Sequence, residues 1–480
     1  MDTMVLDAKQ WASENFGECD FGDLRLTNRL VRYAEACSVR PEDATPQQTQ
    51  KWGQCKATYR FMDNDKVAFQ EIIAPHCRRT RDSIKSGVYL SICDTTQLSF
   101  SLKRKIKALG PVGDNIGQGF FLHTSLIIRE DSEEIIGIGG QELFYRVPKP
   151  KGDTSAKRKK RKRESEVWGR IVAQIGSPQK DAEVIHVCDR GADDFELYCH
   201  CLQTQSGWVV RAQQLKRKIL PLDPQFPESP NTKEKVQLNA YLREKGTDVG
   251  TYQVSIRANK KQRARVAEVT VRSARIWMPR PSVSSPWVKA NGPKWIAMSV
   301  VEVLEKKPKR GVTPIRWVLL THEVVKTFDD CWRVIGRYEK RPIIEEYHKS
   351  AKTGAAMEER LYRTNKRLER ITGILSVLAV RIVQMKTIAK KSPERPAVEV
   401  APRKWIVALC KIHRAQSPKQ RRKWNPRTLT IPDFLRGVAM LGGFLGRKSD
   451  GEPGWITLWR GVKELQLTLR GLRLRTAKKC

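Results

Sequence analysis

The stretch ESEVWGRIVAQIG, residues 164–176, decides the fold class together with AEVIHVCD, residues 182–189, which follows it. The first segment has the apolar spacing of an amphipathic helix, and the second is a short, mostly apolar run, typical of a buried strand. VYLSIC (88–93) has the same character, so we expect two buried strands that end at Asp94 and Asp189. Strands that alternate with helices predict an α/β core.

Further strands are predicted on both sides of this helix. Residues 123–131 and 134–146 are apolar segments that we expect to form a hairpin in the core. Residues 212–312 differ, because apolar and polar residues alternate in 250–259 and again in 265–277. That alternation is typical of antiparallel strands with one solvated face. The sequence therefore predicts an antiparallel β block inserted into the α/β core.

Both ends of the chain are predicted to be helical. Basic and aromatic residues are interleaved near the N-terminus, which suits either a DNA-binding domain or a helical bundle with an ordinary charged surface. Residues 371–391 are apolar, but their amphipathic rhythm favours a packed helix over a membrane span. The predicted division of the chain is a helical DNA-binding domain at 1–72, the first part of the core at 73–211, the β insertion at 212–312, the last part of the core at 313–372, and a helical C-terminal domain at 373–480.

The charge of the chain points to a polyanionic partner. Its 480 residues include 90 Lys and Arg against 52 Asp and Glu, a net charge of +38, which suits nucleic acid or an anionic membrane surface. We expect no membrane span and no signal peptide, so a cytoplasmic nucleic-acid-binding protein is the prediction. The basic run 149–164 is expected to be a surface loop that holds phosphates without sequence preference.

The cysteines predict a reducing compartment. Their number, eleven, is odd, and they are scattered through a long chain, which implies free thiols in a cytosol. A zinc site is not predicted, because Cys188 lies in an apolar strand and the spacing of the local cluster fits no closed site. That cluster consists of His186, Cys188, Cys199, His200 and Cys201.

A polar helix face is predicted in YEKRPIIEEYHKSAK, residues 338–352. In one continuous helix, residues spaced by 3, 4, 4 and 3 would share a face, which suits a place where a phosphate and a metal ion meet. The alternative is a solvated, salt-bridged helix. Pro342 disfavours helical geometry before it, so the helix either begins near Pro342 or is kinked there. The face comprises Tyr338, Arg341, Glu345, Lys349 and Lys352.

Three carboxylates are candidates for a metal site. Strand ends of an α/β sheet are where ligands bind, and Asp94 and Asp189 are expected at two such ends, with Glu345 as a third ligand from the helix. Oxygen-only ligands suit Mg²⁺ or Mn²⁺, and two such ions about 3.5–4 Å apart promote phosphodiester cleavage. The alternative is that the aspartates cap turns or helices.

The chain resembles the bacterial cut-and-paste insertion-sequence transposases with an acidic-triad (DDE) core, in particular the group of bacterial transposon five. The matching segments occur in the same order over nearly the whole chain. They are FGDLRLTNRL (21–30), KATYRFMDND (56–65), DTT (94–96), GFFLHTSL (119–126), VCDRGADDFE (187–196), Tyr338-x2-Arg341-x3-Glu345-x6-Lys352, and LGGFLGRKSDGEPGWITLWRGVKELQ (441–466).

The resemblance implies a ribonuclease-H-like catalytic core, interrupted by an antiparallel β insertion and flanked by helical N- and C-terminal domains, the latter for dimerisation. It implies that Asp94, Asp189 and Glu345 form the metal-binding acidic triad. Trp317 would stabilise a flipped base, although a core tryptophan is the alternative, and Arg211 would touch DNA near the site. The residues that would hold DNA phosphates near the cut are Tyr338, Arg341, Lys349 and Lys352.

The function implied by the resemblance is that of a DNA transposase. It would bind the inverted-repeat ends of its element as a homodimer, cut them with Mg²⁺ or Mn²⁺ (two ions for each site) through a hairpin, and join the 3′-OH ends to target DNA. The expected location is the bacterial cytoplasm, on the nucleoid. The alternatives are a structure-selective nuclease without strand transfer and a catalytically dead DNA-binding protein.

Overall fold

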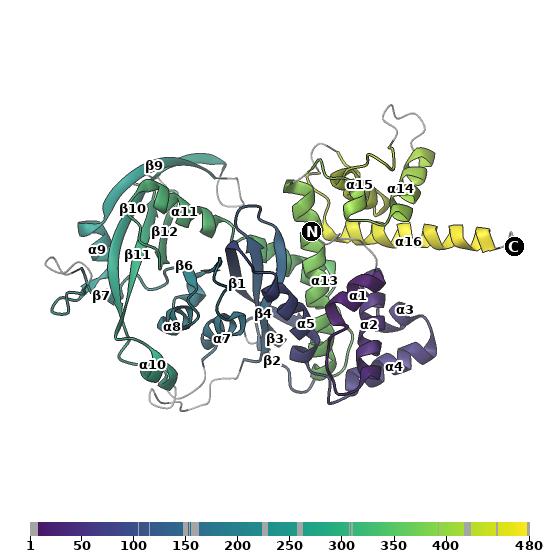
Figure 1. Cartoon of the computed structure of the whole chain (residues 1–480), viewed down its shortest axis with the longest axis horizontal. Coiled ribbons are helices and arrows are strands. Elements are labelled where there is room, and N and C mark those ends of the chain that lie inside the picture. The colour runs from purple at the N-terminus through teal and green to yellow at the C-terminus, as the bar shows by residue number, and fades with distance from the viewer. Residues whose placement is uncertain are drawn as a thin grey trace.

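The computed structural model gives the architecture of most of the chain (Figure 1). It describes residues 8–477 except 104, 115, 147–151, 153, 155–162, 223–228, 257–262, 307, 309–310, 392, 417–423 and 448–449. The predicted basic loop 149–164 therefore lies almost entirely outside the described residues.

A large mixed sheet forms the centre, with strand order β2-β3-β1-β5-β6-β12-β11-β10-β9, and β4 also pairs with β3. β5 and β6 run parallel to β1, and the other pairs are antiparallel. The predicted α/β class is thus confirmed. The strands are β1 (Gly87–Phe100), β2 (Gly110–Val112), β3 (Gly117–Arg129), β4 (Ile135–Phe144), β5 (Ala182–Cys188), β6 (Gly207–Arg211), β9 (Thr247–Ile256), β10 (Arg265–Pro279), β11 (Trp295–Leu304) and β12 (Arg316–Thr321).

The block at 212–312 extends this sheet rather than forming a layer of its own. β9, β10 and β11 are antiparallel, as their alternation predicts, and β12 connects them to the core by pairing Leu320 with Val210 of β6. A small second sheet pairs β7 (Lys218–Ile219) with β8 (Val236–Gln237). The helices α9 (Leu238–Lys245) and α10 (Pro286–Asn291) belong to the same block.

Helices cover both faces of the core strands, which explains why β5 is buried from Val184 to Cys188. Successive side chains of a strand point to opposite faces. Val184 and Cys188 pack into the cluster that contains α7 (Glu166–Ile175) and α8 (Phe195–Gln203). Ile185 and Val187 pack into the cluster on the other face. That cluster includes residues from α11 (Phe328–Glu339), α12 (Ile343–Lys349) and α13 (Asn365–Lys391).

The N-terminal end is helical, as predicted, and consists of five short helices among the described residues. The helices are α1 (Ala8–Phe16), α2 (Leu24–Val39), α3 (Thr45–Thr49), α4 (Trp52–Asp63) and α5 (Phe69–Asp82). Gln50 adopts φ 61° and ends α3, so that α4 begins as a separate helix at Trp52. A positive φ does not fit a continuing right-handed helix.

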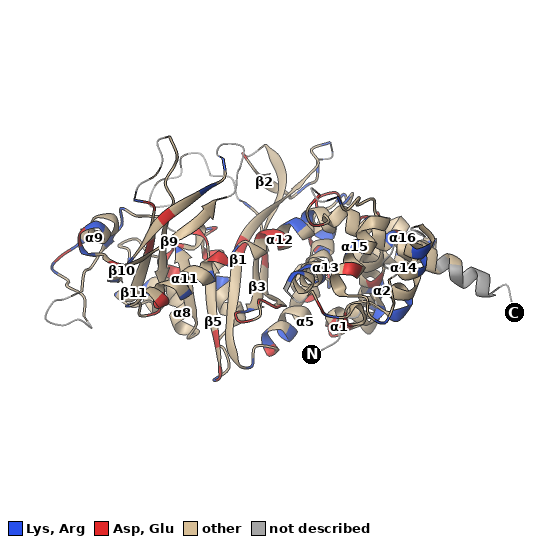
Figure 2. Ribbon diagram, turned by 90° about the horizontal axis from the view of Figure 1, so that it is seen from above, with Lys and Arg blue, Asp and Glu red and all other residues tan. Residues whose placement is uncertain are grey.

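The C-terminal end is also helical and lies next to the N-terminal helices (Figure 1). Among the described residues, α13 is the one helix long and apolar enough to cross a membrane, but 78% of its most apolar window is buried inside the protein. It is a core helix, as its amphipathic rhythm predicts. It is followed by α14 (Arg403–Gln416), α15 (Ile431–Leu441) and α16 (Trp455–Ala477). Figure 2 shows basic positions on these helical ends and also around α12.

Candidate active site

Neighbouring strands bring Asp94 and Asp189 together. The parallel pairing of β1 with β5 ends at Cys93 and Cys188, so each aspartate directly follows the last parallel pair. The prediction that the first strand ends at Asp94 is wrong, because β1 remains paired with β3 and continues to Phe100. The Asp189 carboxylate accepts a hydrogen bond from the Gly191 N–H at 2.8 Å, which fixes the turn after β5.

The segment 338–352 is not one continuous helix. α11 ends at Glu339, Arg341 lies in the turn, and α12 begins at Ile343 directly after Pro342. The prediction of a single helix face is therefore wrong, and its alternative, a helix that begins near Pro342, is confirmed. Lys352 lies beyond α12, in the π-helical turn Ser350–Gly354. Proline fits the first turn of a helix and disfavours helical geometry in the residue before it.

All three candidate carboxylates meet at Arg341. Its Nη2 lies 3.1 Å from Oδ2 of Asp94 and 3.7 Å from Oδ2 of Asp189, and its Nη1 lies 2.7 Å from Oε1 of Glu345. The Arg341 side chain is 15% exposed, whereas that of Glu345 is 61% exposed. One guanidinium thus bridges acidic groups from β1, the turn after β5 and α12.

Burial and charge shape the electrostatics of this cluster. Burial raises the pKa of Asp94 to about 6; Arg341 opposes that rise, and the Asp189 carboxylate adds to it. Burial by itself lowers the pKa of Arg341, but the neighbouring carboxylates outweigh burial and raise it. His348 Nδ1 lies 4.0 Å from Oδ2 of Asp94, and burial lowers the pKa of this histidine to about 3. His348 is therefore neutral at pH 7 and does not compensate the acidic groups.

Tyr338, Trp317 and Arg211 form a second group beside Arg341. The Tyr338 and Trp317 rings meet edge to face, with centroids 5.5 Å apart. Burial raises the pKa of Tyr338, and a hydrogen bond with Arg211 opposes the rise. Arg211 also donates to the carbonyl of Arg316 at 3.3 Å. Trp317 is half-buried and packs against the core. Part of its side chain is therefore accessible to solvent in this structure.

The two predicted lysines lie at the end of α12 and in the π-helical turn that follows it. Lys349 is exposed at the end of the helix. Lys352 Nζ is 3.8 Å from Oε1 of Glu358, an oxygen that also accepts the Ser99 N–H at 2.8 Å. Lys352 therefore lies beside the part of β1 that continues past Asp94.

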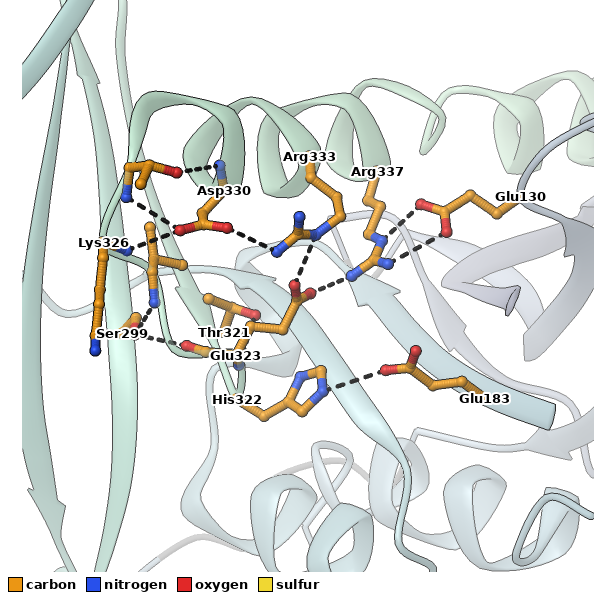
Figure 3. Close-up of polar contacts among 12 residues, drawn as sticks. Glu130, Glu183, Ser299, Thr321, His322, Glu323, Lys326, Asp330, Arg333 and Arg337 are labelled. Atoms are coloured by element: carbon orange, nitrogen blue, oxygen red, sulfur yellow. Dashed lines mark hydrogen bonds and ion pairs between the residues drawn. The ribbon is translucent and has the colours of Figure 1, made fainter. Parts of the chain in front are cut away.

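An ion-pair network that sequence reasoning missed holds the turn in place (Figure 3). Arg337 donates from Nε to Glu130 Oε1 at 2.6 Å and from Nη1 to Glu323. Arg333 Nε donates to Glu323 at 3.0 Å, and Lys340 Nζ donates to the Glu130 carbonyl at 2.7 Å. The spacing of Arg333 and Arg337 is visible in the sequence, but their acceptors come from distant segments. The network fixes the end of α11, and with it the position of Arg341.

The oxygen donors fit a hard divalent cation, and Arg341 now lies between them. Carboxylate oxygens are the ligands that Mg²⁺ and Mn²⁺ prefer. Among the described residues, no three His, Cys, Asp or Glu side chains are grouped to hold a metal as they stand. Arg341 Nε is buried without a hydrogen-bond partner among those residues, an unfavourable state for a buried donor. The donor set therefore suits a cation, provided that Arg341 moves.

The cluster of histidines and cysteines around His186 is part of the packed core. His186 contacts the Ser91 hydroxyl through Nδ1 at 2.9 Å and the Ser206 hydroxyl through Nε2 at 3.1 Å. Both ring nitrogens are thus engaged by hydroxyl groups. The ten cysteines among the described residues are free and buried.

Family models match the two helical ends of the chain. A model described as transposase DNA-binding matches residues 8–67, and one described as the Tn5 transposase dimerisation domain matches residues 377–479. These matches define the class as a transposase that binds DNA and forms a homodimer. More particularly, the chain belongs to the Tn5-like transposases. The carboxylate cluster lies in the core between the two matched segments.

Proposed function

We propose that the protein is a DNA transposase that binds the inverted-repeat ends of its element, cleaves them by metal-dependent phosphoryl transfer through a hairpin, and joins the 3′-OH ends to target DNA. One observation carries the catalytic part: Asp94, Asp189 and Glu345, far apart in sequence, meet around one guanidinium. The net charge of +38 supports a DNA substrate. The substrate would place the protein on the nucleoid in the bacterial cytoplasm.

The sheet supports the proposal of a ribonuclease-H-like core. Strands β4-β3-β1-β5-β6 form a continuous order in which the first three are antiparallel and the last two run parallel to β1. Asp94 lies on the central strand and Asp189 directly follows its parallel neighbour. This is a site at the carboxyl ends of parallel strands, where α/β proteins bind ligands.

Asp94, Asp189 and Glu345 would hold two Mg²⁺ ions, which Mn²⁺ could replace. When bound, such ions activate water and stabilise the leaving oxygen of a phosphodiester. Two of the three carboxylates are open to solvent, because Glu345 is 61% exposed and Asp189 is 37% exposed, whereas Asp94 is 17% exposed.

Arg341 would exchange one anionic partner for another. Without DNA it bridges the carboxylates, and a DNA phosphate offers its guanidinium the bidentate acceptor geometry that arginine prefers. Transfer of Arg341 to a phosphate would free the oxygens of Asp94 and Asp189. It would also allow the Arg341 Nε–H to donate a hydrogen bond to the phosphate. In this proposal DNA binding and cation binding favour each other, because both require Arg341 to leave the carboxylates.

The other candidate residues would position the strand. Lys349 and Lys352 would bind phosphates on the side of α12 that leads to β1, and Arg211 and Tyr338 would do so beside the turn. Trp317 would stack with the base displaced when the hairpin forms; stacking on an aromatic ring contributes about 1–3 kcal/mol for each base. Its edge-to-face contact with Tyr338 holds the ring in place for that role.

A strand-transfer assay tests this function against the nuclease alternative. Purified protein, Mg²⁺, a precut duplex that carries the element's end, and a supercoiled target plasmid are incubated together. We expect the labelled 3′-OH strand to become covalently joined to the plasmid. Cutting of uncut ends without any joining of precut ends would identify a nuclease on the same fold and would contradict the proposal.

A further inference from the structure

A basic hollow lies away from the carboxylate cluster, between the loop that follows β1 and the beginning of α13. Its volume is about 530 Å³. The described residues that line it include three cations and no carboxylate. They are Lys105, Ile106, Lys107, Arg363, Thr364 and Asn365.

The loop wall of the hollow is anchored between its two lysines. Ile106 is buried, and its N–H donates to Oε1 of Gln118 at 3.2 Å. The Gln118 amide in turn donates to the Ser101 carbonyl at 2.8 Å. Lys105 and Lys107 are exposed on either side of this anchor. The backbone between the two lysines is therefore held at Ile106, which lowers the entropy lost when their ammonium groups bind a ligand.

The opposite wall is fixed as well. Tyr362 is buried, and its hydroxyl contacts those of Thr45 and Tyr33 at 2.7 and 2.9 Å. Thr364 accepts the Leu368 N–H at 3.2 Å at the start of the 27-residue helix α13. Arg363 lies between these two anchored residues and is exposed. The partial positive charge of the helix N-terminus adds to that of the side chain.

The cations of the hollow are not neutralised within the described part of the chain. Lys105, Lys107 and Arg363 make no ion pair there, whereas the neighbouring Lys366 and Arg367 pair with Asp65 and Asp63. Concentrated charge of one sign in a concave site attracts a counter-charge. The lining offers side-chain and backbone donors but no acidic acceptor, so it selects an anion.

Strand β1 connects the carboxylate cluster to the loop that lines the hollow. β1 leads from Asp94 to Phe100, about 20 Å at the usual rise of a strand. On the way, Ser99 contacts Glu358, the partner of Lys352. The loop with Lys105 and Lys107 follows directly. A duplex rises about 3.4 Å per base pair, so 20 Å corresponds to about six base pairs.

We propose that this hollow binds a phosphate of the DNA backbone several base pairs from the cleaved bond, without sequence preference. The site rests on the proposed function, because it takes the same DNA that the carboxylate cluster cuts. It contributes affinity and register, and it takes no part in the chemistry.

The test is the salt dependence of binding to a duplex of arbitrary sequence. For Lys105→Ala/Lys107→Ala we expect the slope of log K against log [salt] to become shallower by about 0.9, the value for one released phosphate contact. Lys105→Arg/Lys107→Arg should keep the wild-type slope. The matched control is Lys85→Ala/Lys180→Ala, two exposed lysines near the starts of β1 and β5, which should also keep that slope.

Two outcomes separate this site from the proposed function. If wild type binds and cleaves DNA but Lys105→Ala/Lys107→Ala keeps the wild-type slope, or loses no more than the control pair, the phosphate site is overturned while the transposase remains. If wild type neither binds nor cleaves DNA, the proposed function fails. Both lysines are exposed, so circular dichroism and thermal melting of the variant should match those of wild type.

Discussion

Arg337 and Arg341 lie one helical turn apart in the sequence and have different surroundings. Arg337 is buried between Glu130 and Glu323, and its pairs connect the β3–β4 turn, the end of β12 and α11 (Figure 3). Arg341 bridges three carboxylates, one of which is largely exposed, and keeps a buried Nε without a partner among the described residues. The first arrangement is complete and stabilises the fold. The second is incomplete and suits a group that changes partners.

The largest effect is expected at the acidic cluster itself. Asp189→Ala should reduce DNA cleavage by about 10³-fold, because the proposed cations, which would stabilise charge in the transition state, lose a ligand. End binding in a gel-shift assay should stay within a few-fold of wild type. Asp181→Ala, an exposed aspartate just before the same strand, is the matched control and should cut normally. Cleavage that survives Asp189→Ala would refute the site assignment.

The next effect concerns stability and belongs to Arg337. Arg337→Ala leaves Glu130 and Glu323 without their buried partner, so the unfolding free energy should fall by about 3 kcal/mol. Urea unfolding followed by tryptophan fluorescence measures this. Arg333→Ala is the control, because its side chain is 45% exposed and such pairs contribute about 1 kcal/mol or less. Equal losses for the two variants would show that the network has no special structural role.

Replacement of Arg341 should affect cleavage strongly and stability only slightly, in contrast to replacement of Arg337. Arg341→Gln should lower the cleavage rate by about 10²-fold, the usual cost of removing one transition-state donor. Its urea midpoint should change much less than that of Arg337→Ala. A variant that cuts normally but unfolds as easily as Arg337→Ala would make Arg341 a structural residue and would remove the contrast.

A smaller, pH-dependent effect is expected at His76, which is far from the acidic cluster. Its Nδ1 contacts Oδ1 of Asn15 at 2.8 Å and its Nε2 accepts the Ile138 N–H at 3.1 Å, so it connects α1, α5 and β4. Burial lowers the pKa of His76 to about 3. As pH falls below about 6.5, the unfolded chain takes up a proton that the folded state does not, and stability is lost, by about 2 kcal/mol at pH 5.

The comparison with His76→Gln isolates this contribution. Glutamine can still accept the Ile138 N–H, but it does not titrate. Wild type should lose more stability than His76→Gln between pH 7 and pH 5 in urea unfolding. Parallel losses would mean that His76 is already accessible to protons in the folded protein.

The elements that could be predicted are those determined by residues close together in the sequence. β5 was predicted because its short run is mostly apolar, and the break at Pro342 because proline restricts the residue before it. The continuation of β1 past Asp94 was not predicted, because it depends on pairing with β3, and the residues after Asp94 are polar. Likewise Glu130, Glu323 and Glu358 could not be assigned to partners, since tertiary contacts bring them there.

The residues of the candidate site could be predicted from the sequence, but the contacts between their side chains could not. The sequence indicated that Asp94, Asp189 and Glu345 could act together. It did not show that Arg341, expected on the phosphate, contacts all three carboxylates instead. That contact depends on the turn between α11 and α12, which the Arg337 network holds.

Mn²⁺ binding in the absence of DNA tests most directly whether Arg341 occupies a cation site formed by the three carboxylates. Electron paramagnetic resonance titration would compare wild type, Arg341→Ala and Arg341→Ala/Asp189→Ala. We predict that Arg341→Ala binds Mn²⁺ about tenfold or more tightly than wild type, equivalent to 1.4 kcal/mol or more, and that the double variant loses this gain. Arg341→Ala binding no tighter than wild type, or a gain that persists without Asp189, would contradict the account.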